Sequence, residues 1–460
     1  MDQKQKKKYP VRGKRFGAAG VLLPFFVILL CMAQVLIFSG CGKSAEGPVK
    51  AGKTAEQAAG QAESDTVSVD NGSAAVDTPP ELPGFILQEV IRPDYAEGFA
   101  ICRYEGGYTL LYVPGGESCL VLPEEELREA GESGNTGEMP EEPGVPDGIT
   151  VLRKPLTGVC MAASSVMSLY RALGAVDQIG FSATMADSWY VEEAKEAMLS
   201  GDILFAGKYS APDYEMLLSR GCSLAIESTM IYHHPEVKEK LESLGIPVFV
   251  DQSSYEKNPL GRAEWIKVYG VLTGKEAEAG AFFDRQVRMV QEVQAAAAQE
   301  SPEDSETAEA GAASGQKSRS TAFFYINTSG QAVVRTGDDY IPEMIRMAGG
   351  EYVLTGLRNP NPDSRSGSVS LTMEEFCASA KDADYLIYNT NIDSSVSSLS
   401  DILAKNSLLK EFRAVKEGRV YLTDRYFYQA TDILGEMIVD LHRMYAGEDE
   451  ENMIFLRRLE

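Results

Sequence analysis

The sequence predicts an α/β protein of two lobes joined by one long helix. Short apolar strands alternate with helical patterns in two separate stretches, 149–274 and 321–447, so each lobe is expected to be a mostly parallel sheet flanked by helices. Between them, residues 275–298 carry apolar side chains at spacings of three, four and seven and contain no proline. This segment predicts a rigid inter-lobe helix with a cleft between the lobes. An ordinary surface helix of one larger domain is the alternative.

The first forty residues differ in composition from the rest. Basic residues crowd positions 4–15, an uncharged apolar run extends from Ala18 to about Phe38, and Ser-Gly-Cys ends at Cys41. A basic region, an apolar core and small residues before a cleavage site indicate an export signal. Ser-Gly-Cys after such a run resembles the lipobox of bacterial lipoproteins, which makes residues 1–40 a signal peptide and Cys41 the lipidated residue. A permanent single-pass anchor is the alternative.

Net charge and residue types exclude several classes of function. Without residues 1–40 the chain has 36 basic and 67 acidic residues, a net charge of −31, which argues against a nucleic-acid partner. No CxxC pair occurs, and three His residues are too few for a zinc or manganese receptor, so no metal site is predicted. No GxSxG, HExxH or P-loop motif is present, so no enzyme and no cofactor are expected.

The N-terminal body begins with a low-complexity stretch. Residues 41–80 are rich in Ala, Gly, Ser, Thr and acids, which is typical of a flexible tether. Residues 81–148 are predicted to add a hairpin and a third strand to the N-terminal lobe, followed by an acidic loop, because GFAICRYEGGYTLLYV alternates and turns at Gly106-Gly107. Cys102 and Cys119 flank this hairpin, and the sequence leaves open whether they pair.

The remaining segments follow from the same patterns. Residues 149–274 form the N-terminal lobe, residues 299–320 a disordered acidic insert, residues 321–447 the C-terminal lobe, and residues 448–460 a tail. Ligands of parallel sheets bind outside the carboxyl ends of the strands. The residues that follow those ends are therefore the first candidates for a binding site.

Most of residues 150–446 resembles a known family. Segments such as SSVMSLYRALGAVDQIG, VKEKLESLGIPVFVD, IRMAGGEYVL and FRAVKEGRVYLTD, in this order and spacing, are similar to the solute-binding lipoproteins of bacterial ABC importers for ferric siderophores, haem and corrinoids. The resemblance implies two α/β lobes, one rigid linking helix and a ligand cleft between the lobes. It also implies a lipid-anchored protein on the extracytoplasmic face of the cell membrane, a monomer that serves a permease and ATPase complex.

The resemblance assigns two carboxylates to permease docking. In the family one Glu on each lobe pairs with Arg on the permease, and the matching helix starts place these at Glu236, with Glu239 as the second candidate, and at Glu374, with Glu375 as its neighbour. A helix N-terminus favours an acid in any case through its free N–H groups, which is the competing explanation.

Candidate ligand-binding residues combine aromatic rings with cations. Aromatic rings supply stacking area and Arg supplies paired N–H donors for anionic oxygens, as a ferric catecholate or carboxylate complex requires. Each of these side chains alone is compatible with a structural role. The candidates are Lys208, Tyr209, Tyr232, His233, Arg335, Arg358, Arg365, Tyr388 and Tyr428, with Trp189, Tyr190, Tyr340 and Tyr426 beside them.

Three functions are compatible with this pattern. The first is capture of a ferric-siderophore-type chelate and its delivery to an ABC permease. The second keeps that role with cobalamin, another corrinoid or haem as the ligand, and His233 or a Tyr as an axial ligand. The third is a surface sensor or adhesion lipoprotein without a transport role.

Overall fold

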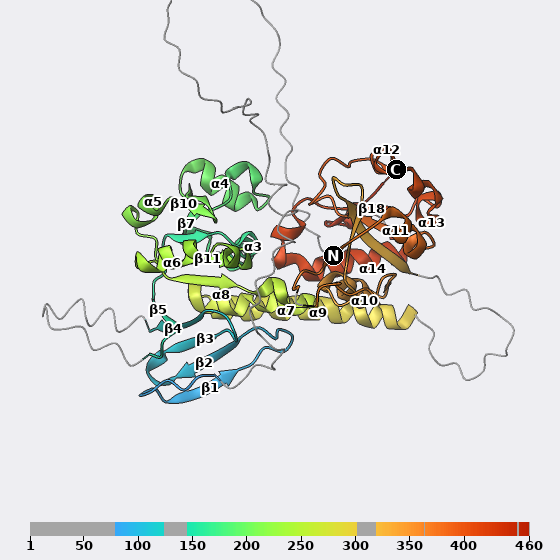
Figure 1. The fold of residues 1–460 in the computed structure, drawn as a ribbon. Coiled ribbons are helices and arrows are strands. Elements are labelled where there is room, and N and C mark those ends of the chain that lie inside the picture. Colours follow the sequence, from blue (N-terminus) through green and yellow to red (C-terminus); the bar gives the residue numbers. More distant parts are fainter. Residues whose placement is uncertain (1–78, 124–144, 301–318, 363, 449, 460) are drawn as a thin grey trace, which may run out of the picture. The chain divides into compact units, whose positions relative to one another are not determined.

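The structure is a computed structural model that describes residues 79–123, 145–300, 319–362, 364–448 and 450–459. These residues form one compact unit with three large β-sheets (Figure 1). The predicted signal peptide, Cys41, nearly all of the tether and most of the two acidic inserts lie outside the described residues. Within the described ranges, no helix has both the length and the apolar character needed to cross a membrane.

The first sheet, here the extension sheet, contains five strands in chain order. They are β1 (Leu87–Ile91), β2 (Ala100–Tyr104), β3 (Thr109–Tyr112), β4 (Ser118–Leu122) and β5 (Ile149–Arg153). The first four pair antiparallel, and β5 pairs parallel with β4. The predicted boundary at residue 149 is therefore displaced, because residues 149–153 complete this sheet and only β6 begins the next one.

The two cysteines of the extension sheet are free and buried. Cys102 lies in β2 and Cys119 in β4, with β3 between them, so the two strands are about 10 Å apart. Their side chains also belong to cores on opposite faces of the sheet. A disulfide is incompatible with this arrangement.

The second sheet forms the N-terminal lobe and is wholly parallel, in the order β12-β11-β6-β7-β8. Its carboxyl ends therefore meet at one edge, as the alternation of strands and helices predicts. The strands are β6 (Val159–Met161), β7 (Ile179–Ser182), β8 (Leu204–Phe205), β11 (Ala225–Ser228) and β12 (Val248–Asp251). The helices are α3 (Ser164–Ala172), α4 (Glu192–Ser200), α5 (Tyr214–Ser219) and α6 (Pro235–Ser243), and a small hairpin pairs β9 (Gly207–Lys208) with β10 (Ala211–Pro212).

Two buried carboxylates attach the extension sheet to the rest of the molecule. Glu264, which is 0% exposed, accepts hydrogen bonds from the backbone N–H groups of Asp94 (3.0 Å), Tyr95 (2.8 Å) and Ala96 (3.0 Å). Glu256 accepts from the N–H groups of residues 97 and 98 and from the Trp265 indole. Several donors satisfy each carboxylate and offset the cost of its burial; for Glu256 that cost is still the larger effect, and burial raises its pKa.

The third sheet forms the C-terminal lobe in the order β16-β14-β13-β17-β18-β19, with β15 also paired to β13. Its central strands are parallel, but β14, β16 and β19 pair antiparallel, so the sheet is mixed. The cause is local: Asn327 and Gly330, with φ of 78°, close a tight hairpin between β13 and β14 that leaves no room for a crossover helix. The strands are β13 (Ser320–Ile326), β14 (Ala332–Arg335), β15 (Glu351–Tyr352), β16 (Ser368–Leu371), β17 (Tyr385–Tyr388), β18 (Val420–Thr423) and β19 (Leu456–Arg458).

The predicted C-terminal tail includes an ordered strand. β19 pairs with β18, and the side chains of Phe455, Leu456 and Leu459 are 3–4% exposed. The helices of this lobe are α10 (Tyr340–Met347), α11 (Met373–Ala380), α12 (Leu399–Lys405), α13 (Arg413–Lys416) and α14 (Leu434–Ala446).

The lobes are connected by three successive helices, α7 (Pro259–Glu264), α8 (Ile266–Thr273) and α9 (Glu276–Glu300). The helix α9 packs against α8 on one side and against α14 of the C-terminal lobe on the other (Figure 1). Gln286, 2% exposed, fixes the second contact: its Nε2 donates to the Asp432 carbonyl (3.3 Å) and to Glu436 (3.0 Å), and its Oε1 accepts from the Gly435 N–H (2.7 Å). These contacts make α9 a fixed brace between the lobes.

Candidate functional site

The predicted N-lobe residues lie at the carboxyl edge of the parallel sheet. Lys208, in β9, and His233, at the end of the turn Thr229–His233 after β11, are exposed. Tyr209 is half-buried, with its ring centroid 5.7 Å from that of His234. Tyr232 is half-buried, and its hydroxyl is already hydrogen-bonded within the protein.

In the C-terminal lobe the structure brings two predicted residues, Arg335 and Tyr428, into one cluster. Arg335 ends β14, and its guanidinium donates to both carboxylate oxygens of Asp339 (3.1 and 2.9 Å) and to the Ser368 hydroxyl (2.6 Å). Burial lowers the pKa of Arg335, but Asp339 and the nearby Tyr428 outweigh it, so the net shift is upward. The Tyr428 hydroxyl accepts a hydrogen bond from Asn389 (3.0 Å).

A second arginine joins this cluster from the segment that precedes the linking helix. The guanidinium carbon of Arg262, in α7, lies 3.6 Å from the centroid of the Tyr340 ring. Its Nε donates to the Glu256 carbonyl (2.9 Å) and its terminal nitrogen to the Ser254 carbonyl, both neutral acceptors. The carboxylates of Asp339 and Asp251 interact with its charge electrostatically. Burial lowers the pKa of Arg262, and the positive charge of Arg335 adds to that effect. The inter-lobe arginine cluster, defined as Arg262, Arg335, Asp339, Tyr340 and Tyr428, thus holds two cations and one carboxylate.

Arg365 also reaches across to the N-terminal side. Its guanidinium carbon lies 4.6 Å from the centroid of the Tyr255 ring, in the turn that follows β12. Arg358 instead donates to the carbonyls of its own loop, at Thr355 (2.8 Å) and Leu357 (2.9 Å). Of the two predicted loop arginines, only Arg365 contacts the other lobe in this structure.

Tyr388 lies in the core. It is 0% exposed, its hydroxyl donates to Asp393 (2.5 Å), and the same oxygen accepts from the Ile326 N–H (3.1 Å). With both hydrogen-bonding roles filled, its hydroxyl stabilises the sheet.

A pocket of about 290 Å³ opens between the loops that follow β7 and β18. Gln429 bridges the lobes beside it: its Oε1 accepts from the Tyr190 N–H (2.9 Å) and its Nε2 donates to the Ser188 carbonyl (2.9 Å). Arg171 lines the pocket and forms an inter-lobe ion pair with Asp432. The remaining lining residues are aromatic or aliphatic: Tyr190, Val191, Tyr426, Ala430, Ile433 and Ile454.

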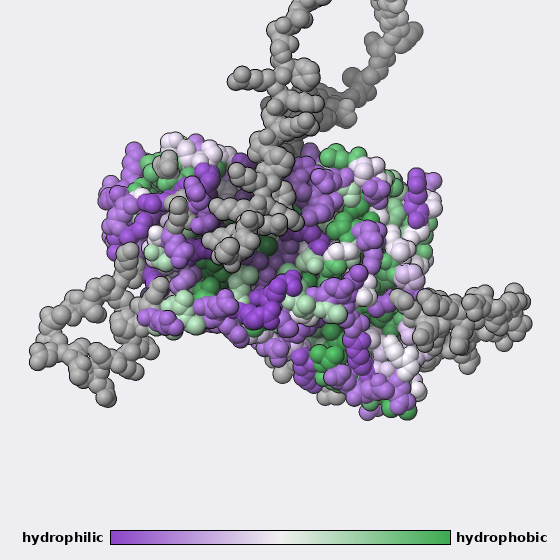
Figure 2. Space-filling view, turned by 180° about the vertical axis from the view of Figure 1, so that it is seen from behind, coloured by the Kyte–Doolittle hydropathy of each residue, from purple (hydrophilic) through white to green (hydrophobic). Residues whose placement is uncertain are grey.

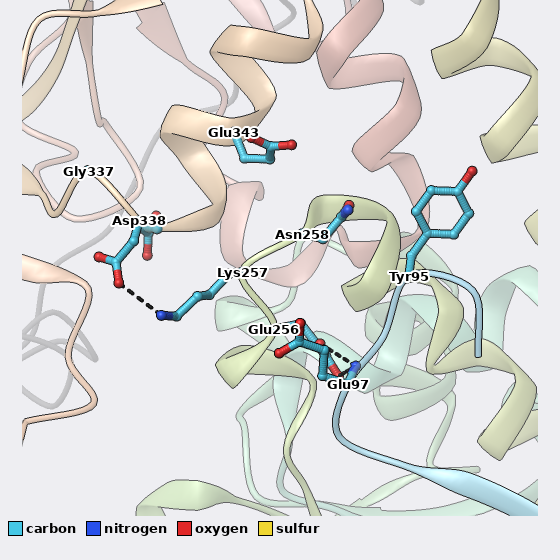
Figure 3. A pocket seen from close by; sticks show the side chains of 9 residues that line it. Tyr95, Glu97, Glu256, Lys257, Asn258, Gly337, Asp338 and Glu343 are labelled. Atoms are coloured by element: carbon cyan, nitrogen blue, oxygen red, sulfur yellow. Dashed lines mark hydrogen bonds and ion pairs between the residues drawn. The ribbon is translucent and has the colours of Figure 1, made fainter. Parts of the chain in front are cut away.

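A second pocket of about 270 Å³ lies where the extension sheet meets both lobes (Figure 3). Its lining is acidic, and the ion pair between Lys257 and Asp338 (2.9 Å) joins the lobes across it. Within the described residues, no group of three or more His, Cys, Asp or Glu side chains is arranged to hold a metal ion. The lining residues are Tyr95, Glu97, Glu256, Lys257, Asn258, Gly337, Asp338, Asp339 and Glu343.

The two predicted docking carboxylates are exposed at helix starts. Glu236 lies in the first turn of α6, 3.2 Å from the Nδ1 of His234, and hydrogen bonds from its own N–H and from His234 lower its pKa. Glu374 lies in the first turn of α11, where Glu375, not Glu374, accepts the bonds of the Thr372 capping box. Both acids are exposed, but only Glu375 is held by the capping box, which leaves the Glu374 carboxylate outside it. The face in Figure 2 is mostly hydrophilic, with small scattered apolar patches, as the acidic composition predicts.

Sequence reasoning missed Arg262 and Tyr255. Tyr255 follows the end of β12, so extending the rule of strand ends to the fifth strand of the N-lobe sheet would have included it. Arg262 lies one segment further on, within a short helix, and its approach to Tyr340 depends on how the two lobes meet. No spacing within the sequence indicates that contact.

Chemically, the inter-lobe region suits binding rather than catalysis. Two guanidiniums offer N–H donors and positive charge to anionic oxygens, and the surrounding tyrosines offer stacking area and hydroxyls. Two α/β lobes that meet at such a region define a ligand-binding protein. The chain belongs to the periplasmic binding protein family, whose profile matches residues 159–426, more than half of the sequence. This is a family of binding proteins and not of enzymes, as the sequence analysis predicts.

Individual relatives are distant. An uncharacterized lipoprotein of Methanocaldococcus jannaschii is 25% identical over 308 residues, which cover 64% of this chain and 66% of the relative. A second lipoprotein of that organism is 26% identical over 223 residues, or 46% of this chain and 51% of the relative. The chain thus spans between half and just under two thirds of these relatives. Among solved structures, a periplasmic haem-binding protein of Vibrio cholerae has a TM-score of 0.48 and 17% identity, covering 62% of this chain and 99% of that one.

Proposed function

We propose that this chain is a membrane-anchored extracytoplasmic solute-binding protein that captures a ferric-siderophore-type chelate between its lobes and delivers it to an ABC permease. The observation that carries the choice of ligand is the inter-lobe arginine cluster, in which Arg262 and Arg335 share one carboxylate. Two guanidiniums that share one carboxylate at a partly buried site favour a ligand with anionic oxygens. Anchoring through Cys41 and docking through Glu236 and Glu374 complete the proposal.

The ligand is tested by titration of the native protein with ferric hydroxamate, ferric catecholate and ferric citrate complexes. Trp189 and Trp265, the two tryptophans of the chain, are 1% and 0% exposed, so quenching by a bound ferric chelate is expected to occur by energy transfer and not by contact. Saturable quenching by one of these chelates supports the proposal. Quenching and a coloured complex with haemin or cobalamin alone would instead support haem or a corrinoid as the ligand. No response to any of these compounds would contradict a role in the transport of a metal chelate.

Arg262→Met tests the residue that the cluster singles out. This change removes the charge and keeps an apolar stem over the Tyr340 ring, so it should weaken binding of an anionic ferric chelate by about tenfold or more. Loss of the hydrogen bond to the Glu256 carbonyl should also lower the melting temperature, so binding is measured well below it. The matched control is Arg220→Met, which removes an exposed arginine at the end of α5. Equal affinities for the native protein and Arg262→Met would exclude Arg262 from the ligand site.

A further inference from the structure

One turn of the extension sheet lies over the carboxyl edge of the N-lobe sheet. The turn between β3 and β4 is closed by a hydrogen bond from the Gly116 N–H to the Val113 carbonyl (3.0 Å). From this turn, Glu117 accepts a hydrogen bond from the Tyr232 hydroxyl (2.9 Å) and lies 3.5 Å from the Lys238 ammonium. The extension sheet, which precedes the family match at residue 159, therefore touches the segment that follows β11.

The packing of this turn is close. A Cβ atom at Gly116 would lie 2.2 Å from the Nε2 of Gln252, the first residue after β12, so a side chain at residue 116 would displace the Gln252 amide. The same Nε2 donates to the Tyr232 hydroxyl (3.2 Å). Tyr232 thus donates to Glu117 and accepts from Gln252. Burial and the Glu117 carboxylate both raise the pKa of this phenol well above its usual range.

A line of neighbours runs from this turn to the other lobe. Tyr232 is an electrostatic neighbour of Tyr255, whose ring lies under the guanidinium of Arg365 from the C-terminal lobe. Glu117 therefore lies at one end of a row of side chains that crosses the inter-lobe region. Its side chain is 15% exposed and that of Lys238 is 24% exposed, so the contact is shielded from solvent.

We propose that Glu117 is a specificity-determining positioning residue, which holds the Tyr232 hydroxyl so that Tyr232 meets a ligand through its ring and not through a bond to the metal. The inference rests on the proposed function and narrows it to coordinatively saturated ferric chelates. A ligand whose iron needs a phenolate from Tyr232 is disfavoured. The extension sheet then acts as a third wall of the ligand region.

The test combines a readout that needs no ligand with a binding assay. In protein labelled with 3-fluorotyrosine, the ¹⁹F resonance of Tyr232 is assigned by its loss in Tyr232→Phe. Glu117→Ala should shift this resonance and lower the pH at which it titrates, whereas Glu89→Ala, which removes an exposed carboxylate of β1, should leave it unchanged. Lys238 keeps Glu242 at 2.9 Å in the variant, so no charge is left without a partner.

In the binding assay, Glu117→Ala should weaken capture of the ferric chelate that the native protein binds by about tenfold and should add a phenolate-to-iron absorption band with haemin. Glu117→Gln, which retains an acceptor oxygen, should return the affinity to within about twofold of native. An unchanged Tyr232 resonance and unchanged affinity in Glu117→Ala would overturn the inference. If no chelate binds the native protein while the resonance shifts as expected, the proposed function fails and the positioning role stands.

Discussion

Glu227 shows how a single buried acid makes the N-terminal lobe sensitive to pH. It lies in β11 and is 2% exposed, and its Oε2 has no hydrogen-bond partner within the described residues. Burial raises its pKa from 4.5 to about 8. The folded protein therefore holds a proton on this carboxyl at neutral pH, where the unfolded chain has lost it.

The stability of the protein should fall as pH rises through the window between these two values. Between pH 4.5 and about 8 the folded state binds more protons than the unfolded state, so the free energy of unfolding decreases with pH and levels off above the folded pKa. Glu227→Gln removes the titration and should flatten this dependence, with a gain on the order of a few kcal/mol near pH 8.5. Melting temperatures from pH 5 to 9 measure both effects. A slope in Glu227→Gln as steep as that of the native protein, or an equal change in the exposed control Glu215→Gln, would refute this assignment.

At the residue scale the sequence predicted types of side chain better than their partners. Arg335 and Tyr428 were both predicted, and they lie in one cluster. Arg358 and Tyr388 follow equally suggestive positions, but one is hydrogen-bonded to its own loop and the other is buried in the sheet. Arg358 is held by carbonyls of its own loop, and Tyr388 by a carboxylate five residues away. Neither contact is evident from the residue type or from a position after the end of a strand.

At the element scale, the long helix was the most predictable part of the chain. Its apolar spacing predicted residues 275–298, and α9 extends from Glu276 to Glu300. Elements with little apolar content were missed: β19 presents only a few buried side chains amid charged residues, so its pairing with β18 left no periodic signal. The antiparallel pairs of the C-terminal sheet were also not predicted. In their apolar pattern, two strands joined by a tight turn look the same as two consecutive parallel strands, and only the turn between them reveals the difference.

Replacing each of two glycines near the junction of α8 and α9 by alanine should change the stability of the protein in opposite directions. A Cβ at Gly270 would lie 2.7 Å from the Cβ of Ala279, so Gly270→Ala should destabilise the protein by about 1–3 kcal/mol. A Cβ at Gly280 would meet nothing within 4 Å, so Gly280→Ala should stabilise α9 by about 0.5–1 kcal/mol. Denaturant unfolding of both variants measures the difference.

The pair Gly270 and Ala279 also provides its own control. If the clash is the cause, Gly270→Ala combined with Ala279→Gly should be more stable than the sum of the two single changes allows. Additive effects would show that the close approach of α8 and α9 does not set the cost.

At the scale of the whole molecule, the predicted task of the protein requires that ligand capture and permease docking be separable. Glu236 and Glu374 lie on different lobes, each exposed in the first turn of a helix, whereas the arginine cluster lies between the lobes. Glu236→Lys with Glu374→Lys should therefore leave chelate affinity unchanged and reduce uptake by about tenfold or more in cells that carry the matching permease. Glu196→Lys, an exposed change on α4, is the control.

Uptake by the double variant at the native rate, with a native melting temperature, would remove both residues from the docking surface. A loss of chelate affinity in the same variant would instead indicate that the helix starts take part in holding the ligand. Measuring binding and uptake on one preparation separates these outcomes.

The attachment of the extension sheet has a consequence for how freely its sequence can change over evolution. Glu264 and Glu256 bind main-chain N–H groups, so these hydrogen bonds do not depend on which side chains occupy the opposing segment. The exposed Asp94 and Glu97 should therefore accept most substitutions except proline, which lacks the N–H donor. Ala96, which is 7% exposed, and Tyr95, whose ring packs against Phe283, are constrained by the core. Gly98 is constrained as well, because a Cβ there would lie 3.0 Å from both Glu256 and Trp265. The exposed positions of this junction can diversify while the two carboxylates stay fixed.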